Sequence, residues 1–418
     1  MSWDAEQFSL DDQSRFETLN GLWSGKKPPF VTAGVIRNTN FTESGRVDYS
    51  DVAWLQVEQR QLAKRQLKPG DIIVERSGGG PKQPVGRVVY FDREDVPFSF
   101  SNFTSAIRVR DCEAFDSKFV FYGLLELYQS GRTEDIQRHT TGIRNLDFTA
   151  YKGRATFPQI PLPEQRKIAG VLGVVQRAIE QQERLLQLTA ELKKTLLHQL
   201  FTQGLRDEPQ KQTEIGPVPE SWEVVRLGDA FDTQLGKMLS QKARVGNDPK
   251  PYLRNKNVQW GRIDLSDLLQ MDFSEREKAK FLLTPGDLFV CEGGEPGRAA
   301  IWRGGMEECY YQKALHRLRP KDERITNEFM VYWLMFSFEM QNLYGVAGAS
   351  STIAHLPEIQ LKSLPIPRPE RSEQDEMCKA ISHVDSRIAV LEKKRAALSD
   401  LFRTLLHQLM TAQIRVHD

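Results

Sequence analysis

The sequence predicts an α+β chain in which two similar α/β domains are separated by a pair of long antiparallel helices, an intramolecular coiled coil with pseudo-twofold symmetry. Three observations support this prediction. A hexapeptide occurs twice, half a chain length apart, other blocks recur in the same order, and each copy ends in a long heptad pattern. Because one unit is written twice, function is expected to lie in what two tandem copies do together.

The repeated hexapeptide Thr-Leu-Leu-His-Gln-Leu stands at Thr195–Leu200 and Thr404–Leu409, 209 residues apart in a chain of 418. Other blocks repeat in one order at offsets of 204 to 217, which excludes coincidence. They are Arg-Asn-x-Asn (Arg37–Asn40, Arg254–Asn257), Gly-Arg-x-Asp (Gly45–Asp48, Gly261–Asp264), Leu-x-Pro-Gly-Asp with three apolar residues after it (Leu67–Val74, Leu283–Val290), Gly-Arg (Gly86–Arg87, Gly297–Arg298) and an apolar segment (Phe119–Leu127, Phe329–Phe336).

Each copy closes with Pro-Leu-Pro or Pro-Ile-Pro, at Pro161–Pro163 and Pro365–Pro367, ahead of a Glu-Gln pair. On this alignment the second copy carries five extra residues, Arg368–Ser372. Because proline is favoured in the first turn of a helix, these prolines mark the starts of two helices. Each helix is expected to have about 40 residues, and at about 1.5 Å per residue it would span about 60 Å.

Apolar residues in both helices recur at steps of three and four, which is the heptad seam of a coiled coil. Polar residues interrupt the seam at Gln182, Thr189, Lys193 and Arg395, and such positions are expected to fix the register at some cost in stability. The first seam is Leu172, Val175, Ile179, Leu186, Leu196 and Leu200, and the second is Ile381, Val384, Ile388, Leu391, Leu398, Phe402, Leu405 and Leu409.

The alternative is that each stripe packs only on its own globular domain. We favour the intramolecular pair because a seam of about five heptads is longer than one small domain covers, and because each seam offers the other a partner. The helices then lie antiparallel, since the second domain follows the far end of the first helix. The predicted organisation is a domain over residues 1–157, a helix over 158–206, a domain over 207–364 and a helix over 365–418.

Composition restricts the class of protein. With 39% hydrophobic and 27% charged residues both halves are expected to be globular, and a net charge of +1 excludes a polycation that coats nucleic acid. The four cysteines show neither C-x-x-C pairing nor metal-ligand spacing, so we expect reduced thiols, no metal site and a cytoplasmic location. The polar start, Met1–Asp12, does not resemble a signal peptide. The apolar run Phe329–Phe338 is too short to span a bilayer and is expected to be a buried helix.

The glycine-rich loop that follows the Leu-x-Pro-Gly-Asp strand differs between the copies. In the first copy Arg76–Lys82 reads Arg-Ser-Gly-Gly-Gly-Pro-Lys and carries two cations. Its counterpart Glu292–Arg298 keeps glycines and one arginine but has an acidic residue and a glycine in place of Arg76 and Ser77. A repeated scaffold with divergent loop chemistry is the pattern expected when two copies recognise two different targets.

Base readout uses Arg for guanine and Asn or Gln for adenine, while Lys and Ser suit phosphates. Residues of these types in and near the loops are therefore DNA-contact candidates, although any one surface Arg is more often simply solvated. The candidates are Arg76, Ser77, Lys82, Arg87, Asn102, Arg108, Arg144 and Asn145 in the first copy and Arg298, Tyr311, Gln312, Lys313, Arg317, Ser351 and Thr352 in the second.

Known catalytic motifs are missing from the sequence. Gly236–Lys237 lacks the upstream glycine and the hydroxyl residue of a P-loop. In Lys27–Phe30, a lysine stands where the Pro-Pro-Tyr/Phe motif of amino-methyltransferases needs Asn or Asp. No glycine fingerprint for a nucleotide cofactor follows a strand, and G-x-S-x-G is also absent. The chain is therefore predicted to bind and position rather than to catalyse.

Taken together, the motifs resemble the specificity (S) subunits of type I restriction-modification systems. The resemblance covers essentially the full chain. Its carriers are Val218–Trp222 ahead of Leu227–Asp229, Leu-x-Pro-Gly-Asp in both halves, the Pro-rich Glu-Gln helix entries and Leu-Leu-His-Gln-Leu near both helix ends. The first half departs from the pattern because it lacks a clear Val-Pro-x-x-Trp, which leaves the start of the first domain open.

The resemblance implies two target recognition domains that each read one part of a split double-stranded DNA sequence. It also implies partners: two methyltransferase subunits and motor-nuclease subunits. S-adenosylmethionine, ATP and Mg are then expected on those partners and no cofactor in this chain. The main rival is a coiled-coil adaptor that joins two protein partners without reading DNA. An enzyme with an unrecognised site is a weaker rival, since no acid/base or metal constellation repeats.

Overall fold

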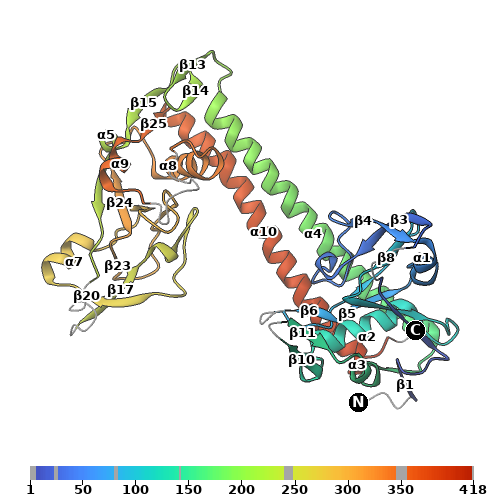
Figure 1. The fold of residues 1–418 in the computed structure, drawn as a ribbon. Helices are drawn as coiled ribbons and strands as arrows, with labels where there is room; N and C mark the ends of the chain where they lie inside the picture. Colours follow the sequence, from blue (N-terminus) through green and yellow to red (C-terminus); the bar gives the residue numbers. More distant parts are fainter. Residues whose placement is uncertain are drawn as a thin grey trace. The chain divides into compact units, whose positions relative to one another are not determined.

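The computed structural model describes residues 6–22, 27–79, 83–140, 143–239, 248–344 and 355–416. The chain divides into two compact units (Figure 1). The first is Met1–Glu183 with Lys393–Asp418, and the second is Arg184–Glu392. Each unit contains one globular part and one half of each of two long helices, α4 (Leu162–Gln203) and α10 (Arg371–Met410). The predicted boundaries treat those helices as separate segments, whereas the units divide both of them.

The first unit is built on a four-stranded antiparallel sheet of order β2-β9-β5-β7. Its strands are β2 (Phe16–Asn20), β9 (Thr104–Val109), β5 (Ile72–Glu75) and β7 (Val88–Tyr90). The smaller sheets are β4-β3-β8 (Ala53–Glu58, Phe30–Ile36, Phe98–Phe100), β10-β11-β6 (Gln137–Thr140, Ile143–Leu146, Ser77–Gly79) and β1-β12 (Gln7–Ser9, Thr156–Pro158). The helices are η1 (Asn38–Asn40), α1 (Gln59–Arg65), α2 (Ser117–Gln129), η2 (Glu134–Ile136) and α3 (Phe148–Arg154).

The second unit repeats this plan with the sheet β16-β24-β21-β22, again antiparallel throughout. Its strands are β16 (Phe231–Leu235), β24 (Leu315–Pro320), β21 (Leu288–Cys291) and β22 (Ala299–Ile301). The smaller sheets are β20-β17-β23 (Leu269–Asp272, Pro249–Leu253, Tyr310–Tyr311), β15-β25 (Glu223–Arg226, Pro365–Arg368), β13-β14 (Gln210–Thr213, Gly216–Pro219) and β18-β19 (Val258–Gln259, Arg262–Ile263). The helices are α5 (Leu227–Ala230), η3 (Asn255–Asn257), α7 (Glu275–Phe281), α8 (Asn327–Leu334), η4 (Met335–Met340) and α9 (Glu358–Ser363).

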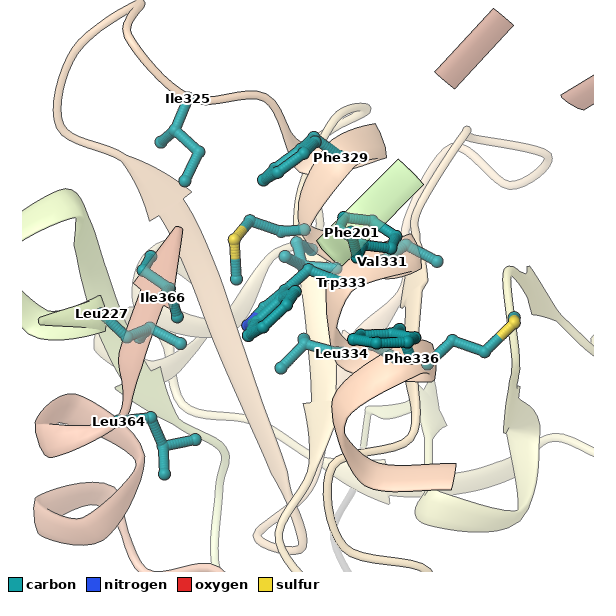
Figure 2. Close-up of a cluster of buried hydrophobic side chains, with 14 of the residues drawn as sticks. Phe201, Leu227, Ile325, Phe329, Val331, Trp333, Leu334, Phe336, Leu364 and Ile366 are labelled. Carbon is teal, nitrogen blue, oxygen red and sulfur yellow. The ribbon is translucent and has the colours of Figure 1, made fainter. Parts of the chain in front are cut away.

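The ends of the long helices belong to the hydrophobic cores of the two units. In the first unit the early residues of α4, such as Leu172, share a core with Phe402 and Leu409 near the end of α10. In the second unit the end of α4 packs against the same core as the beginning of α10, and Figure 2 shows Phe201 of α4 beside Phe329 and Phe336. Each helix therefore begins in one unit and ends in the other, which confirms the predicted antiparallel direction.

The seam residues are all at least half-buried. Fully buried are Leu172, Ile179, Leu200, Ile381, Leu391, Phe402 and Leu409, and half-buried are Val175, Leu186, Leu196, Val384, Ile388, Leu398 and Leu405. The seam nevertheless misses Leu197, Phe201 and Leu406, which are buried in the domain cores. Because each helix end faces both a domain and the other helix, its apolar stripe is wider than an a/d seam. Near their ends, the two long helices thus do pack on the globular domains, as the alternative interpretation of the apolar stripes expected.

The prediction of five inserted residues before the second helix is wrong. The buried Gln165 side chain donates to the carbonyl of Ile160 (2.9 Å) and accepts from the N–H of Asp116 (2.9 Å). Gln374 repeats this pattern with the carbonyl of Pro369 (2.9 Å) and the N–H of Thr326 (3.0 Å). The glutamines and their carbonyl partners lie 209 positions apart, and the two N–H partners lie 210 apart, so no five-residue insertion separates the copies here. Pro367 therefore corresponds to Pro158. Pro158 is the last residue of β12, and Pro367 lies in β25.

These glutamines give the Glu-Gln pair a structural role. Asp116 and Thr326 are the N-cap residues of α2 and α8. Each glutamine therefore ties the first turn of a long helix to the start of the apolar helix of its unit. The apolar segment Phe329–Phe338 is buried in α8 and η4, as predicted. None of the helices within the described residues is both long and apolar enough to cross a membrane.

Candidate nucleic-acid interface

The repeated Arg-Asn-x-Asn block forms the same loop in both units. The amide of Asn40 donates to the carbonyls of Asp48 (3.2 Å) and Asp51 (3.0 Å). Asn257 does the same with the carbonyls of Asp264 (3.0 Å) and Asp267 (3.1 Å). Asparagine suits this position because one amide group bridges two backbone acceptors. The last asparagine of the repeat is thus explained by local structure.

The middle asparagine of the block reaches the glycine-rich loop. Asn38 donates to the carbonyl of Ser77 (3.3 Å), and Asn255 donates to the carbonyl of Gly293 (3.2 Å). The next residue in each loop is a glycine with positive φ, Gly78 (109°) and Gly294 (81°). A Cβ there would lie 2.4 Å or 2.5 Å from the asparagine Nδ2 atom. Only glycine permits this approach, so both asparagines fix where the loops leave the domain.

The arginines of the Gly-Arg pair are engaged inside their units. Arg87 forms a two-point ion pair with the buried Glu75, Nε to Oε2 and Nη2 to Oε1, both at 2.8 Å. It also donates to the carbonyl of Asn38 (2.9 Å). Arg298 likewise donates to the carbonyl of Asn255 (2.9 Å) and to Glu295 Oε2 (2.6 Å). Both candidates therefore stabilise the base of the loop, and this argues against a DNA contact by either side chain.

The aspartate of Leu-x-Pro-Gly-Asp also binds an arginine from the central sheet. Arg108 contacts both oxygens of Asp71, with each N–O distance at 2.7 Å. The corresponding pair in the second unit is Arg319 with Asp287, at 2.5 and 3.0 Å. Asp71 and Asp287 are buried, and a buried carboxylate needs such a partner. Arg108 is thus a structural residue of the repeat, which the sequence alone could not distinguish from a DNA contact.

Tyr311 is fully buried, with 0% of its surface exposed. Its hydroxyl donates to the carbonyl of Gln234 (3.3 Å), and the guanidinium of Arg317 lies 5.6 Å from its ring centre. Arg317 also donates to the carbonyl of Lys280 (3.2 Å). Tyr311 has no face for a base, so its assignment to the DNA-contact set has no support in its position. Lys313, two residues later, is exposed.

Arg76 is the candidate whose surroundings point most clearly to a ligand. Its Nη1 donates to Asn20 Oδ1 (3.0 Å) and Ser105 Oγ (3.3 Å), and its guanidinium lies 4.7 Å from the Phe148 ring centre. All three partners are neutral, and no carboxylate among the described residues forms an ion pair with it. Burial without a compensating anion lowers the pKa of Arg76. The structure thus holds a half-buried positive charge that is left without an opposite charge.

Four further candidates of the first copy lie around Arg76. The hydroxyl of Ser77 donates to Asn145 Oδ1 (2.6 Å) where β6 pairs with β11. The N–H of Arg76 donates to the carbonyl of Phe103 (2.8 Å), which follows the exposed Asn102 in a turn. Arg144 precedes Asn145 in β11 and pairs with Gly79. The strands β6 and β11 lie side by side (Figure 1), and with one turn they bring together the predicted candidates Arg76, Ser77, Asn102, Arg144 and Asn145.

The second unit has the same framework with different side chains. Glu292 takes the place of Arg76, since its N–H donates to the carbonyl of Ala314 (2.8 Å) in the turn that holds Gln312 and Lys313. The N–H of Leu356 donates back to the Glu292 carbonyl (2.7 Å). His316 contacts the same leucine: its Nε2 lies 2.9 Å from the Leu356 carbonyl oxygen. Burial lowers the pKa of His316, so this imidazole is held in its neutral form.

Three candidates, Lys82, Ser351 and Thr352, lie outside the described residues. Other contributors were missed in the sequence: Asn20, Phe148 and Ser105 around Arg76, and Glu292 and His316 in the second unit. Their sequence positions give no hint of their proximity, because they come from distant strands and, for Phe148, from a helix. Asn38 and Asn255 did carry a signal, since they repeat within the Arg-Asn-x-Asn block. The described residues hold no group of three or more His, Cys, Asp or Glu side chains arranged for a metal ion.

Comparison with known proteins agrees with this geometry. Residues 219–399 match the family model described as the type I restriction modification DNA specificity domain. The type I restriction enzyme MjaVIII specificity subunit of Methanocaldococcus jannaschii is 26% identical over 315 residues, which covers 72% of this chain and 71% of the relative. The putative MjaX specificity subunit of the same organism is 21% identical, over 95% of this chain and 91% of the relative.

A solved structure shares the fold over almost the whole chain. It is the S subunit of a type I restriction-modification system from M. genitalium, with a TM-score of 0.57 and 16% identity over 97% of this chain and 96% of that chain. A structure from work on the assembly and conformational transition of the type I restriction-modification system gives a TM-score of 0.56 over 96% and 98%. Both likenesses concern the fold.

Proposed function

We propose that this chain, which belongs to the family of type I restriction-modification specificity subunits, binds a bipartite double-stranded DNA sequence with one unit on each part. In this role it is a recognition subunit and not an enzyme. It acts by placing other subunits on DNA. We also propose that it works in the cytoplasm, where the host DNA lies.

One observation supports the two-reader function above all others. At the same place in two copies of one scaffold, the first unit presents Arg76 and Ser77, and the second presents Glu292 and Gly293. The backbone N–H and carbonyl groups of Arg76 and Glu292 make equivalent hydrogen bonds, so the two positions differ in their side chains. Side chains that diverge on a repeated frame are expected where each copy binds its own base sequence.

For partners, we propose two methyltransferase subunits and motor-nuclease subunits, which would bind S-adenosylmethionine, ATP and Mg in place of this chain. Exposed apolar residues on α4 within the second unit support a protein contact there. Leu185, Leu188 and Leu192 follow one another at helical spacing and are 40, 42 and 57% exposed. Such a row on one helix face is a feature of surfaces that bind another protein.

The alternative is an adaptor that joins protein partners without reading DNA. Titrating a fluorescent duplex with the full chain, at salt concentrations from about 50 to about 300 mM, separates the two functions. A DNA-reading subunit should lose affinity steeply with salt and should prefer duplexes that contain its sequence over scrambled ones. An adaptor should show neither a salt-dependent affinity nor a preference, and that result would overturn the proposed function.

A further inference from the structure

We propose that Arg76 reads the acceptor edge of a guanine in one part of the DNA site, and that Glu292 reads the amino group of a cytosine or adenine in the other part. This inference rests on the proposed function and deepens it. It assigns opposite hydrogen-bonding roles to equivalent positions in the two units. The two positions share a backbone frame, Arg76 has unusual surroundings and Glu292 carries the opposite charge.

The two positions are equivalent in their backbone hydrogen bonds. Each residue directly follows a buried strand of the central sheet, β5 before Arg76 and β21 before Glu292. The N–H of each donates at 2.8 Å to a turn, at Phe103 or Ala314. The carbonyl of each accepts from a leucine, Leu146 at 2.8 Å or Leu356 at 2.7 Å. The two side chains therefore leave the same backbone frame, which makes their chemistry directly comparable.

The guanidinium of Arg76 is held in a fixed plane with donors to spare. The Phe148 ring lies against it, and Nη1 takes the bonds to Asn20 and Ser105. Nε and Nη2 donate to no described residue. Two parallel N–H groups on a planar fork match the O6 and N7 acceptors of guanine. Because no anion among the described residues compensates the charge, a ligand that offers two acceptors recovers part of the cost of burial.

Glu292 offers the opposite chemistry from the same place. An ionised carboxylate accepts hydrogen bonds and donates none, and no Lys or Arg among the described residues pairs with it. The nearby His316 is held neutral by burial and does not supply a compensating charge. The base groups that match such an acceptor are the amino groups of cytosine and adenine in the major groove.

The charge inversion favours bases over phosphates as the ligands. The phosphate backbone is chemically the same in both parts of any DNA site. A position that contacts phosphate would thus have no reason to change from a cation in one unit to an anion in the other. Base edges do differ between the two parts of a site, and donor and acceptor patterns can be exchanged between them.

The test selects bound duplexes from a randomised pool with the full chain and sequences them. The variants are Arg76→Gln and Glu292→Gln, with Arg60→Gln and Glu307→Gln as controls that remove an exposed charge from the same unit. Arg76→Gln should lower the preference for guanine at one position about tenfold and leave the other part of the site unchanged. Glu292→Gln should change one position in that other part only, and the controls should select the wild-type sequence.

Other outcomes identify which idea fails. No sequence preference in the wild type would overturn the proposed function itself. A selective wild type combined with a uniform loss of affinity in Arg76→Gln would indicate a phosphate contact and overturn base reading. If Arg76→Gln does not fold, Arg76→Lys replaces it, since lysine keeps the charge but loses the planar fork. That variant should bind DNA with weaker guanine preference, and an unchanged preference would contradict the inference.

Discussion

The hydroxyl of Tyr332 donates to the carboxylate of Asp385 at 3.0 Å, and Tyr122 donates to Gln176 in the equivalent bond at 2.8 Å. Tyr332 and Tyr122 lie in α8 and α2, whereas Asp385 and Gln176 lie in α10 and α4. Each apolar domain helix therefore binds the beginning of the long helix that follows it in the chain. The internal repeat predicted from the sequence is thus reproduced in individual hydrogen bonds.

Each of these tyrosine rings also contacts a residue from the second half of the other long helix. Phe402 of α10 packs edge-on against Tyr122, with ring centres 6.2 Å apart, while Lys193 of α4 lies 6.0 Å from the Tyr332 ring centre. Lys193 also forms an ion pair with Asp385 at 2.6 Å. Lys193 and Phe402 are 209 positions apart. Equivalent residues of the two long helices therefore contact the equivalent tyrosine in each unit. Lys193, a polar residue of the seam in α4, is thus paired with Asp385 of α10.

Removing the Asp385 carboxylate should destabilise the second unit. Asp385→Ala leaves Lys193 without its anion and Tyr332 without its acceptor, so we expect a loss of about 1 to 3 kcal/mol in the free energy of unfolding. Urea unfolding followed by tryptophan fluorescence measures it. Asp400→Ala is the control, because that carboxylate is exposed on the same helix, and its effect should stay within about 0.5 kcal/mol. Equal losses in both variants would contradict the role assigned to Asp385.

The clamp formed by Gln374 should also matter for stability. Gln374→Ala would leave the Thr326 N–H and the carbonyls of Arg324 and Pro369 without their partner in a buried site. Groups of this kind cost about 1 to 3 kcal/mol each when unpaired, so the total loss should exceed that of a typical surface substitution. Differential scanning calorimetry would report it, with the exposed Glu370→Ala as the control. A Gln374→Ala protein as stable as wild type would show that the clamp contributes nothing.

Asn38 and Asn255 are predicted to position the reading loops. Asn38→Ala should weaken selection of one part of the DNA site about tenfold, and Asn255→Ala should do the same for the other part only. The reason is that each amide fixes the carbonyl at the base of its own glycine-rich loop. Competition binding with duplexes mutated in one part at a time measures the effect. Loss at both parts in either variant would mean that the asparagines act on global folding.

Acid should destabilise the second unit through His316. Burial holds the pKa of His316 below the usual 6.5. When the pH falls below 6.5, the unfolded chain takes up a proton that the folded unit does not bind, so stability declines until the folded-state pKa is reached. One proton gives a slope of up to about 1.4 kcal/mol per pH unit. His316→Gln should flatten the slope of urea stability between pH 7.5 and pH 5.5, and an unchanged slope would exclude this histidine.

Much of the architecture was predictable because the sequence contains two copies of one unit. The duplication, the two long helices and their antiparallel direction follow from repeats and heptads, which are visible over many residues. Errors arose where single residues had to be matched. Three prolines lie close together near the start of each long helix. The sequence pattern matched Pro161–Pro163 with Pro365–Pro367, whereas Pro158 is the residue that corresponds to Pro367. The hydrogen bonds of Gln165 and Gln374 resolve that choice.

The candidate contacts were less predictable for a physical reason. An arginine beside a glycine-rich loop looks the same in sequence whether it faces solvent or a carboxylate on a neighbouring strand. Arg87 is bound by Glu75, and Arg108 by Asp71, through strand pairing that the sequence does not display. Arg76 differs only because its strand neighbours Asn20 and Ser105 are neutral. Whether an arginine is paired with a carboxylate inside its own unit thus depends on partners from distant segments.

The most direct test of the two-reader account is the sequence that the full wild-type chain selects from a randomised duplex pool. We expect two blocks of specified bases separated by a constant number of unspecified positions. Deleting one heptad from each long helix should change that number and leave both blocks unchanged, because the helices set the spacing. A single specified block, or selection without any preferred sequence, would contradict the account.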